Sequence, residues 1–402
     1  MAGMGIRALE LARAIRRAGF EARLLVPNDA GEAREAAGDV PVREAPPGAL
    51  GDAARGAAAA VVSGHAANAW FHEAPGVPVA VDLYDPFPVE NLHYARTLGA
   101  ETARHDRATL ALALARGDFF LCASPEQRLF YAGALFASER IGAENFPDDP
   151  TLQGLLATVP FGVPEAPSSG DAAQGRAALG MSREKADTVE GPVVLFGGVY
   201  DWYDPELLLE AWPEVRRHHP GARLLFFENP NASTTPQGVF EKTRARARAA
   251  DPDGRSILFA PWLPYAARAD LYAACDLLAA LSTEGLETEL AYRTRLLDAA
   301  WGGVPSVTVA GGSLAGELAR EGAAVESPRD AVALAHTVAE LLADAPRRAA
   351  MASSARAFAA GRTWDRVARP LTAWLARARV DPGRRPLPEA ARNGSRLARL
   401  FK

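Results

Sequence analysis

The chain has 402 residues, of which 49% are hydrophobic and 23% are charged. This is the composition of an ordinary globular protein, and the length fits about two domains of roughly 150 to 200 residues each. The formal net charge of -5 gives no general attraction to nucleic acid or to an anionic membrane, so nucleic acid is not an expected partner.

Signals for export and for membrane insertion are missing from the sequence. No positively charged start precedes a long apolar stretch, and no run of about 18 uncharged apolar residues occurs. We therefore expect no transmembrane segment and predict a cytoplasmic protein. The two cysteines, Cys122 and Cys275, each lie in an apolar run, which predicts buried thiols in a reducing compartment, without a disulfide or a metal cluster.

The N-terminal half alternates helical and strand patterns. Residues 6–20 space apolar side chains at helical intervals around a stop at Gly19, and residues 21–27 then read as a short buried strand. The clearest further helix is expected at 100–115, and further strands are predicted at 59–63, 78–84 and 118–123. This alternation predicts a parallel sheet covered by helices.

The start of the chain departs from the usual order of a doubly wound domain. Such a domain opens with a strand that feeds a glycine-rich turn and then a helix, whereas this chain begins MAGMGIRALEL, already in the turn. We therefore expect the first N-terminal strand to be missing, through a start site assigned too late or a trimmed sequence. In-frame upstream codons for a short apolar strand would support this explanation.

The C-terminal half repeats the alternation more regularly, after a loose Ser/Gly/Asp/Ala segment at 168–174. Its strands are predicted at 192–197, 222–228, 256–260, 276–281 and 304–309. We predict four regions: an N-terminal Rossmann-like domain at 1–165, a linker at 166–190, a C-terminal Rossmann-like domain at 191–365, and a C-terminal helix and tail at 366–402. Ligands of open parallel sheets bind beyond the carboxyl ends of the strands, so we expect the chemistry in a cleft between the domains.

The tail ends in RNGSRLARLFK, in which Leu397, Leu400 and Phe401 form one face of a short helix. Two interpretations stay open for this basic end: a locally docked or frayed terminus, and a helix that contacts a membrane surface peripherally.

Residues 287–318, ETELAYRTRLLDAAWGGVPSVTVAGGSLAGEL, resemble the donor-binding segment of family 4 retaining glycosyltransferases, EGxGxxxLEAMAxGxPVVxxxxGGxxE. FGGVYDWYDPELLLEAW resembles the first strand and helix of that family's C-terminal domain, and FAPWLPYAARADLYAACDLLAAL resembles its base-binding loop. GMGIRALELARAIRRAGFEARLLVP is similar to the glycine-rich turn and first helix of its N-terminal domain. The resemblance implies the GT-B fold, an α/β architecture in which two Rossmann-like doubly wound domains face a cleft.

The resemblance also implies which charged residues act on the donor. Family members carry an Arg and a Lys near the first strand of the C-terminal domain, where this chain has GGVYDWYDPEL. Arg293 and Arg295 would take over the binding of the diphosphate, unless they lie at a solvated helix start or form an internal salt bridge with Glu287 or Glu289. Glu287 would meet the hydroxyls of the donor sugar, with Glu284 and Glu289 as rivals.

Further donor residues are implied along the same half. Asp298 stands where the family has the glutamate that binds the ribose, the alternative being a solvated helix residue. A helix start would present N–H groups to the diphosphate, or else form a simple turn, at Gly311, Gly312 and Ser313. The loops that follow two strands supply the remaining candidates, Gly197, Gly198, Trp202, Trp262, Leu263 and Pro264.

The acceptor side is expected in the N-terminal half, where polar residues follow strand ends. His65 is the catalytic candidate there, against the alternative of a hydrogen-bonded structural histidine. The other acceptor-side residues are two glycines that would let the backbone approach a ligand and two acids of the run DLYDPFPVEN, namely Gly3, Gly5, Asp82 and Asp85.

The resemblance implies a retaining transfer of a hexose-type sugar from a nucleotide-diphosphate donor to the hydroxyl of a sugar, lipid-linked or small-molecule acceptor. No metal and no cofactor are expected, and cell-surface polysaccharide or glycoconjugate assembly is the expected setting. A GT-B nucleotide-sugar epimerase is one alternative, which product analysis with and without acceptor distinguishes. A non-catalytic GT-B binding or scaffold subunit is the other, favoured by the absent Arg/Lys pair and the missing strand.

Overall fold

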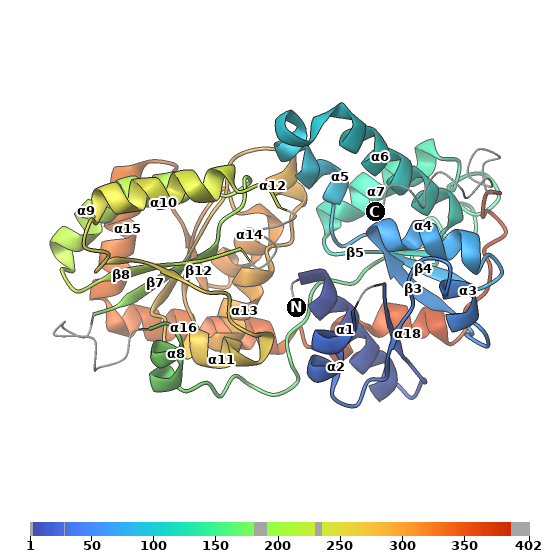
Figure 1. Cartoon of the computed structure of the whole chain (residues 1–402), viewed down its shortest axis with the longest axis horizontal. Helices are drawn as coiled ribbons and strands as arrows, with labels where there is room; N and C mark the ends of the chain where they lie inside the picture. The colour runs from blue at the N-terminus through green and yellow to red at the C-terminus, as the bar shows by residue number, and fades with distance from the viewer. Residues whose placement is uncertain (1–2, 28, 181–190, 230–234, 387–402) are drawn as a thin grey trace. The chain divides into compact units, whose positions relative to one another are not determined.

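The computed structural model describes residues 3–27, 29–180, 191–229 and 235–386. Contacts divide the chain into an N-terminal unit, made of residues 3–161 together with the chain from Trp364 onward, and a C-terminal unit of residues 162–363. In each unit parallel strands are covered by helices, so the predicted α/β class is confirmed (Figure 1). Within the described part of the chain, no helix combines the length and hydropathy needed to cross a membrane.

The N-terminal unit holds two separate sheets. The smaller one pairs β1 (Leu24–Val26) with β2 (Val42–Glu44) and shares a small core with α1 (Gly3–Arg17) and α2 (Gly31–Ala37). The larger one has the order β3-β4-β5-β6, with strands at Ala60–Ser63, Val79–Asp82, Phe119–Cys122 and Leu156–Thr158. Among the described residues, α1 is the first element.

Helices surround these sheets, and the chain returns to this unit at its C-terminal side. Within α6 the helix is interrupted at Gly99, whose φ is 80°. The Trp374 ring of α18 stacks on Phe119 of β5 at 5.4 Å, so these late residues complete the core of the N-terminal unit. The helices are α3 (Leu50–Ala53), α4 (Gly64–Glu73), α5 (Phe87–Glu90), α6 (Ala95–Arg116), α7 (Pro125–Ala137), α17 (Trp364–Val367) and α18 (Arg369–Leu375).

The C-terminal unit is one six-stranded parallel sheet in the order β12-β11-β10-β7-β8-β9. Its strands are β7 (Val193–Gly198), β8 (Arg223–Phe227), β9 (Ile257–Ala260), β10 (Leu277–Leu281), β11 (Ser306–Val309) and β12 (Ala324–Glu326). The strand order reverses direction between β7 and β10, so this pair of neighbours is the topological switch point of the sheet.

Helices cover both faces of this sheet. Trp212 of α9 is buried against β7 and β8 in the same apolar core as side chains of α10 and α15. Figure 1 shows α9 and α10 over one face and α8, α11, α13 and α16 along the other. The bounds are α8 (Ala172–Ala178), α9 (Pro205–His218), α10 (Gly238–Ala250), α11 (Arg268–Ala273), α12 (Leu286–Leu290), α13 (Thr294–Gly302), α14 (Gly312–Arg320), α15 (Ala331–Ala343) and α16 (Ala345–Ala360).

The four domain boundaries drawn from the sequence stay predictions. The tail face of Leu397, Leu400 and Phe401 lies outside the described residues.

Candidate functional site

The switch point of the C-terminal unit is where its loops converge. The loop after β7 and the loop after β10 are tied together, because Thr283 donates its backbone N–H to the Trp202 carbonyl at 3.0 Å and Asp204 donates to the Leu281 carbonyl at 3.1 Å. The crevice outside the carboxyl ends of such neighbouring strands is the usual ligand site of an open parallel sheet. Most of the donor residues predicted from the sequence lie on the loops and helices that begin at this edge.

The guanidinium of Arg295, a residue of α13, lies at the end of β7. Its guanidinium donates to the carbonyls of Phe196 and Gly198, at 2.7 and 2.9 Å, and stacks on the Tyr203 ring at 3.8 Å. Gly197, with φ 88°, forms the register shift in β7 that brings these two carbonyls to the same side chain. A half-buried positive charge therefore stands at the switch point, held by backbone groups.

Arg293 and Glu287 are bound to each other. Two hydrogen bonds, of 2.8 and 2.6 Å, join the guanidinium to both carboxylate oxygens, and the side chains are 5% and 2% exposed. The internal salt bridge that the sequence left open is the arrangement that forms. Neither group is presented to a ligand in this conformation, while the rivals Glu284 and Glu289 are exposed.

The turn from β11 into α14 has unusual backbone geometry. Ala310 has φ 50° and Gly312 has φ 68°, in a backbone region that residues other than glycine rarely adopt. A Cβ on Gly312 would lie 2.6 Å from the Thr288 carbonyl oxygen, so only glycine fits there. The Ser313 Oγ is buried without a hydrogen-bond partner among the described residues. The start of α14 thus combines free helical N–H groups with an unused hydroxyl.

Asp298 of α13 lies beside a cation that the sequence analysis did not single out. The Nε of Arg268 lies 3.9 Å from the Asp298 carboxylate, and its guanidinium carbon lies 3.7 Å from the centre of the Tyr265 ring and 4.7 Å from that of Trp301. Burial raises the pKa of the Asp298 carboxyl, and the charge of Arg268 opposes that rise. In the sequence Arg268 looked like an ordinary basic residue at a helix start, so no local pattern marked it.

The remaining donor-side candidates belong to two aromatic loops. Trp202 stacks on Tyr200 with ring centroids 5.1 Å apart and an interplanar angle of 1°. Trp262 is 37% exposed and lies next to Gly198, where an added Cβ would be 3.8 Å from its ring. Leu263 is half-buried and Pro264 is exposed.

The N-terminal unit contains a hollow of about 310 Å³ that brings three predicted residues together. Its lining is Met4, Ser63, Gly64, His65, Asp82, Asp85, Phe87 and Asn91. The glycine-rich turn expected at the start is instead the first turn of α1, which places Gly3 and Gly5 on an exposed helix end. The expectation was wrong at this point because the helical spacing of the following apolar residues extends back to Gly3.

The charge of Asp82 is neutralised by a buried arginine that does not line the hollow. Arg7 of α1, which is fully buried, donates to both carboxylate oxygens at 2.6 and 3.0 Å and also to the carbonyls of Val159 and Pro160. Its guanidinium lies 4.7 Å from the centre of the Tyr84 ring. Sequence reasoning named Asp82 but not its pairing with Arg7, since 75 positions separate the two residues.

His65 has both ring nitrogens facing partners. Its Nδ1 is 3.2 Å from the Thr109 hydroxyl, its Nε2 is 3.5 Å from the Asp106 carboxylate, and its ring stacks on His105 at 5.0 Å. Burial, followed by the charge of His105, lowers the pKa of His65, although Asp106 opposes the shift. This geometry matches the structural alternative, a neutral imidazole held by hydrogen bonds.

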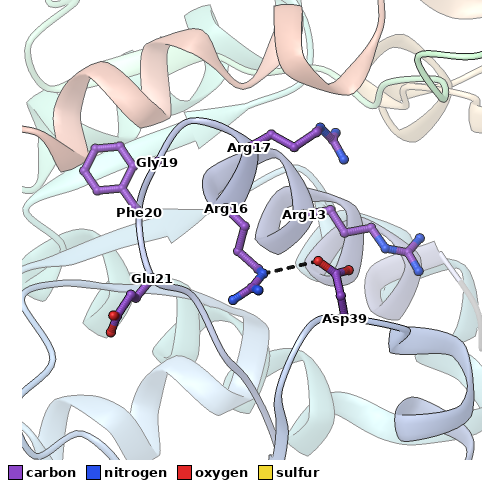
Figure 2. A pocket seen from close by; sticks show the side chains of 7 residues that line it. All are labelled: Arg13, Arg16, Arg17, Gly19, Phe20, Glu21 and Asp39. Carbon is purple, nitrogen blue, oxygen red and sulfur yellow. Dashed lines mark ion pairs between the residues drawn. The ribbon is translucent and has the colours of Figure 1, made fainter.

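A larger hollow, of about 600 Å³, lies beside α1 and is lined by three arginines, but its charges are offset (Figure 2). Arg16 faces Asp39 at 3.6 Å, as Figure 2 shows, and Arg13 binds Glu10 at 2.7 Å. Arg17 forms an ion pair with Asp365 at 2.7 Å. No residue predicted to act on a substrate lines this hollow.

Comparison with known sequences matches residues 191–344 to the family model described as Glycosyl transferases group 1. The D-inositol 3-phosphate glycosyltransferase of Segniliparus rotundus is 31% identical over 207 residues, which are 49% of this chain and 41% of that protein. The chain thus spans about two fifths of the length of this curated relative.

Solved structures match nearly the whole chain at low sequence identity. HepE from Anabaena, solved in complex with UDP and glucose, has a TM-score of 0.67 at 18% identity, covering 94% of this chain and 96% of that one. Sucrose-phosphate synthase from Thermosynechococcus elongatus has a TM-score of 0.64 at 15% identity, covering 94% and 93%. WaaG, a glycosyltransferase involved in lipopolysaccharide biosynthesis, has a TM-score of 0.55 at 18% identity, covering 93% of this chain and 95% of that one. The fold is therefore the GT-B fold.

Proposed function

We propose that the chain is a glycosyltransferase that uses a nucleotide-diphosphate sugar, which the match of residues 191–344 to the family model described as Glycosyl transferases group 1 supports. The observation that carries the proposal is the start of α14, where Gly312 is held against the Thr288 carbonyl and the Ser313 hydroxyl has no partner among the described residues. Helix N-termini with free N–H groups bind phosphate groups. The HepE complexes with UDP and with UDP-glucose support a donor of this kind.

The proposed mechanism places the donor on the C-terminal unit. N–H groups of α14 hold the diphosphate and stabilise the charge that develops on it as the bond to the sugar breaks. Arg295 adds positive charge at the end of β7, through a guanidinium that is already fixed by Phe196 and Gly198. The acceptor hydroxyl attacks from the face that the diphosphate leaves, so the sugar keeps its anomeric configuration. The transfer needs no metal.

The acceptor is proposed to be a neutral hydroxyl compound that binds in the 310 Å³ hollow of the N-terminal unit. The lining contains no lysine or arginine, and the charge of Arg7, which does not line the hollow, is already paired with Asp82. His65 is held as a neutral ring, and Asp85 adds negative charge. A phosphate on the acceptor would meet repulsion here, whereas sugar hydroxyls find acceptors.

We place the reaction in the cytoplasm, which the two free thiols of Cys122 and Cys275 support, and in the assembly of a surface polysaccharide or glycoconjugate. The likeness to WaaG supports the second point at the level of fold.

Two measurements, made one after the other, test this function. A thermal-shift screen of UDP, GDP, ADP and dTDP should raise the melting temperature with at least one nucleotide. The matching nucleotide sugars, incubated with neutral sugar acceptors, should then give a new glycoside whose anomeric configuration, read by NMR, equals that of the donor. No shift with any nucleotide contradicts the proposal, and an epimerised nucleotide sugar without a glycoside points to the epimerase.

A further inference from the structure

One face of α7 leaves large apolar side chains in solvent. Leu129 is 74% exposed and Phe136 is 70% exposed, and their spacing of about two helical turns places them on the same side of the helix. Gly133 lies exposed between them, in a helix interior where glycine is less favourable than alanine, and a Cβ there would meet nothing within 4 Å. Together they form an apolar surface that another segment can approach closely.

Acidic residues border this α7 face at both ends. Glu126 precedes Leu129 by one turn on the same side of the helix, Glu139 follows the end of the helix, and both are exposed. Arg128, the basic residue of α7, donates to the Thr151 carbonyl. Negative charge disfavours the anionic headgroups of a membrane, and pairing with a second copy would bring acids against acids. The face therefore suits a segment that is both apolar and basic.

The C-terminal segment of the described chain is fixed beside one end of the α7 face. Arg385 donates to the Glu139 carbonyl at 3.1 Å and pairs with its carboxylate, while Ala115 and Arg116 bind the backbone of Arg385. Residues 387–402 follow from this point and lie outside the described residues. The 13 residues of α7 span about 20 Å, whereas ten extended residues reach roughly 33 Å, so the segment is long enough to reach the whole face.

The sequence of residues 387–402 has the chemistry that the α7 face lacks. Its apolar residues Leu397, Leu400 and Phe401 have the spacing of one helix face. Glu389 is its one acidic residue, and its basic residues are Arg392, Arg396, Arg399 and Lys402. A segment tethered this closely has a high effective concentration at the face, so a modest contact is enough to hold it.

We propose that residues 394–402 bind the α7 face, with their apolar side chains on Leu129, Gly133 and Phe136 and their basic side chains toward Glu126. Binding removes the two large apolar side chains from water, which is the favourable contribution. Charge attraction sets the direction, because the tail starts at the Glu139 end and its basic residues are then drawn to the Glu126 end. Of the two interpretations of the tail, this is the locally docked one.

Hydrogen exchange by mass spectrometry on the full chain, without nucleotide, tests this contact. The amides of residues 394–402 should exchange at least about tenfold more slowly than in an unstructured peptide. Phe136→Ser on α7 and Leu400→Ser in the tail should each return them to about the unstructured rate. Val332→Ser, which changes a 64% exposed side chain of α15, should leave them protected. Glu126→Lys should speed their exchange, because it repels the basic tail.

Three results would overturn the inference. The first is a wild type whose tail amides exchange at the unstructured rate, and the second is protection that persists in Phe136→Ser. The third is protection that increases with protein concentration as light scattering detects dimers, since the face then binds a second copy. If Phe136→Ser does not fold, Leu400→Ser must show the loss of protection, or the inference is wrong. An unprotected tail in a chain that binds phosphatidylcholine vesicles containing phosphatidylserine through Phe136 would assign the face to a membrane instead.

Discussion

Charged residues that the sequence marks as candidate ligands turn out to be partners of one another. Glu287 was predicted to meet the donor sugar and Arg293 the diphosphate, yet the two form a buried bidentate pair. In the N-terminal unit, Asp82 was predicted on the acceptor side and instead pairs with Arg7, which was not predicted to bind a ligand. A charge in a low-dielectric interior must be paired, and the sequence shows that charges lie near apolar runs but not which pairs meet.

Glu287→Gln should lower the free energy of unfolding by about 3–5 kcal/mol, because it leaves the Arg293 guanidinium buried without its counter-charge. Denaturant unfolding at neutral pH measures the loss. Glu289→Gln, an exposed neighbour on the same short helix, should stay within about 0.5 kcal/mol of the wild type. Equal losses for the two variants would contradict the pairing.

His65 should make the protein less stable as the solution is acidified. Burial lowers its folded-state pKa below 6.5, so between pH 6.5 and that lower value the unfolded chain binds the proton and the folded chain does not. The His65 contribution to stability is therefore complete above pH 6.5 and falls as pH decreases. Unfolding free energies at pH 7.5 and 5.5 should differ less in His65→Gln than in the wild type; an unchanged difference would reject this assignment.

At the scale of elements, the strands of four residues or more were predictable, whereas three of the four three-residue strands were not. The patterns at 192–197 and 276–281 correspond to β7 and β10, because buried parallel strands read as continuous apolar runs. The strands that the sequence analysis did not anticipate, β2, β6 and β12, have three residues each, too few to display a period. The helix start at α14 was predicted from its glycines. The contacts of the Arg268 guanidinium with the Tyr265 and Trp301 rings were not predicted, because the two rings come from separate elements.

The turn into α14 offers a matched pair of glycine substitutions. Gly312→Ala should destabilise the protein by more than about 1 kcal/mol and weaken nucleotide binding, because a Cβ there meets the Thr288 carbonyl at 2.6 Å with φ at 68°. Gly316→Ala, inside the same helix, should instead stabilise by roughly 0.5–1 kcal/mol. Thermal unfolding with and without nucleotide reports both effects. A harmless Gly312→Ala would remove the geometric basis of the proposed phosphate site.

At the scale of the whole molecule, the late residues of the chain fasten onto the N-terminal unit. Arg384 pairs with Asp118 and donates to the carbonyls of Pro75 and Arg116, while Asp381 donates its backbone N–H to Asp118. These contacts join residues more than 260 positions apart, so no local pattern predicts them. The sequence analysis accordingly treated residues 366–402 as a separate helix and tail.

Arg384→Met should cost about 3–5 kcal/mol of unfolding free energy, because the Asp118 carboxylate, whose side chain is fully buried, loses its counter-charge. Arg385→Met removes only the exposed pair with Glu139 and should cost no more than about 1 kcal/mol. Denaturant titration of both variants checks the difference. If Arg385→Met were the more damaging, the C-terminal segment would be held by other contacts.

Hydrogen exchange measured by mass spectrometry, with and without the nucleoside diphosphate that gives the largest thermal shift, tests the central claim most directly. The account predicts slower exchange at the start of α14, residues 312–315, and at the end of β7, residues 196–200, where bound phosphate engages or covers backbone N–H groups. Nucleotide binding that leaves both segments unchanged, or that protects only residues 63–91 of the N-terminal unit, would contradict a donor site on the C-terminal unit.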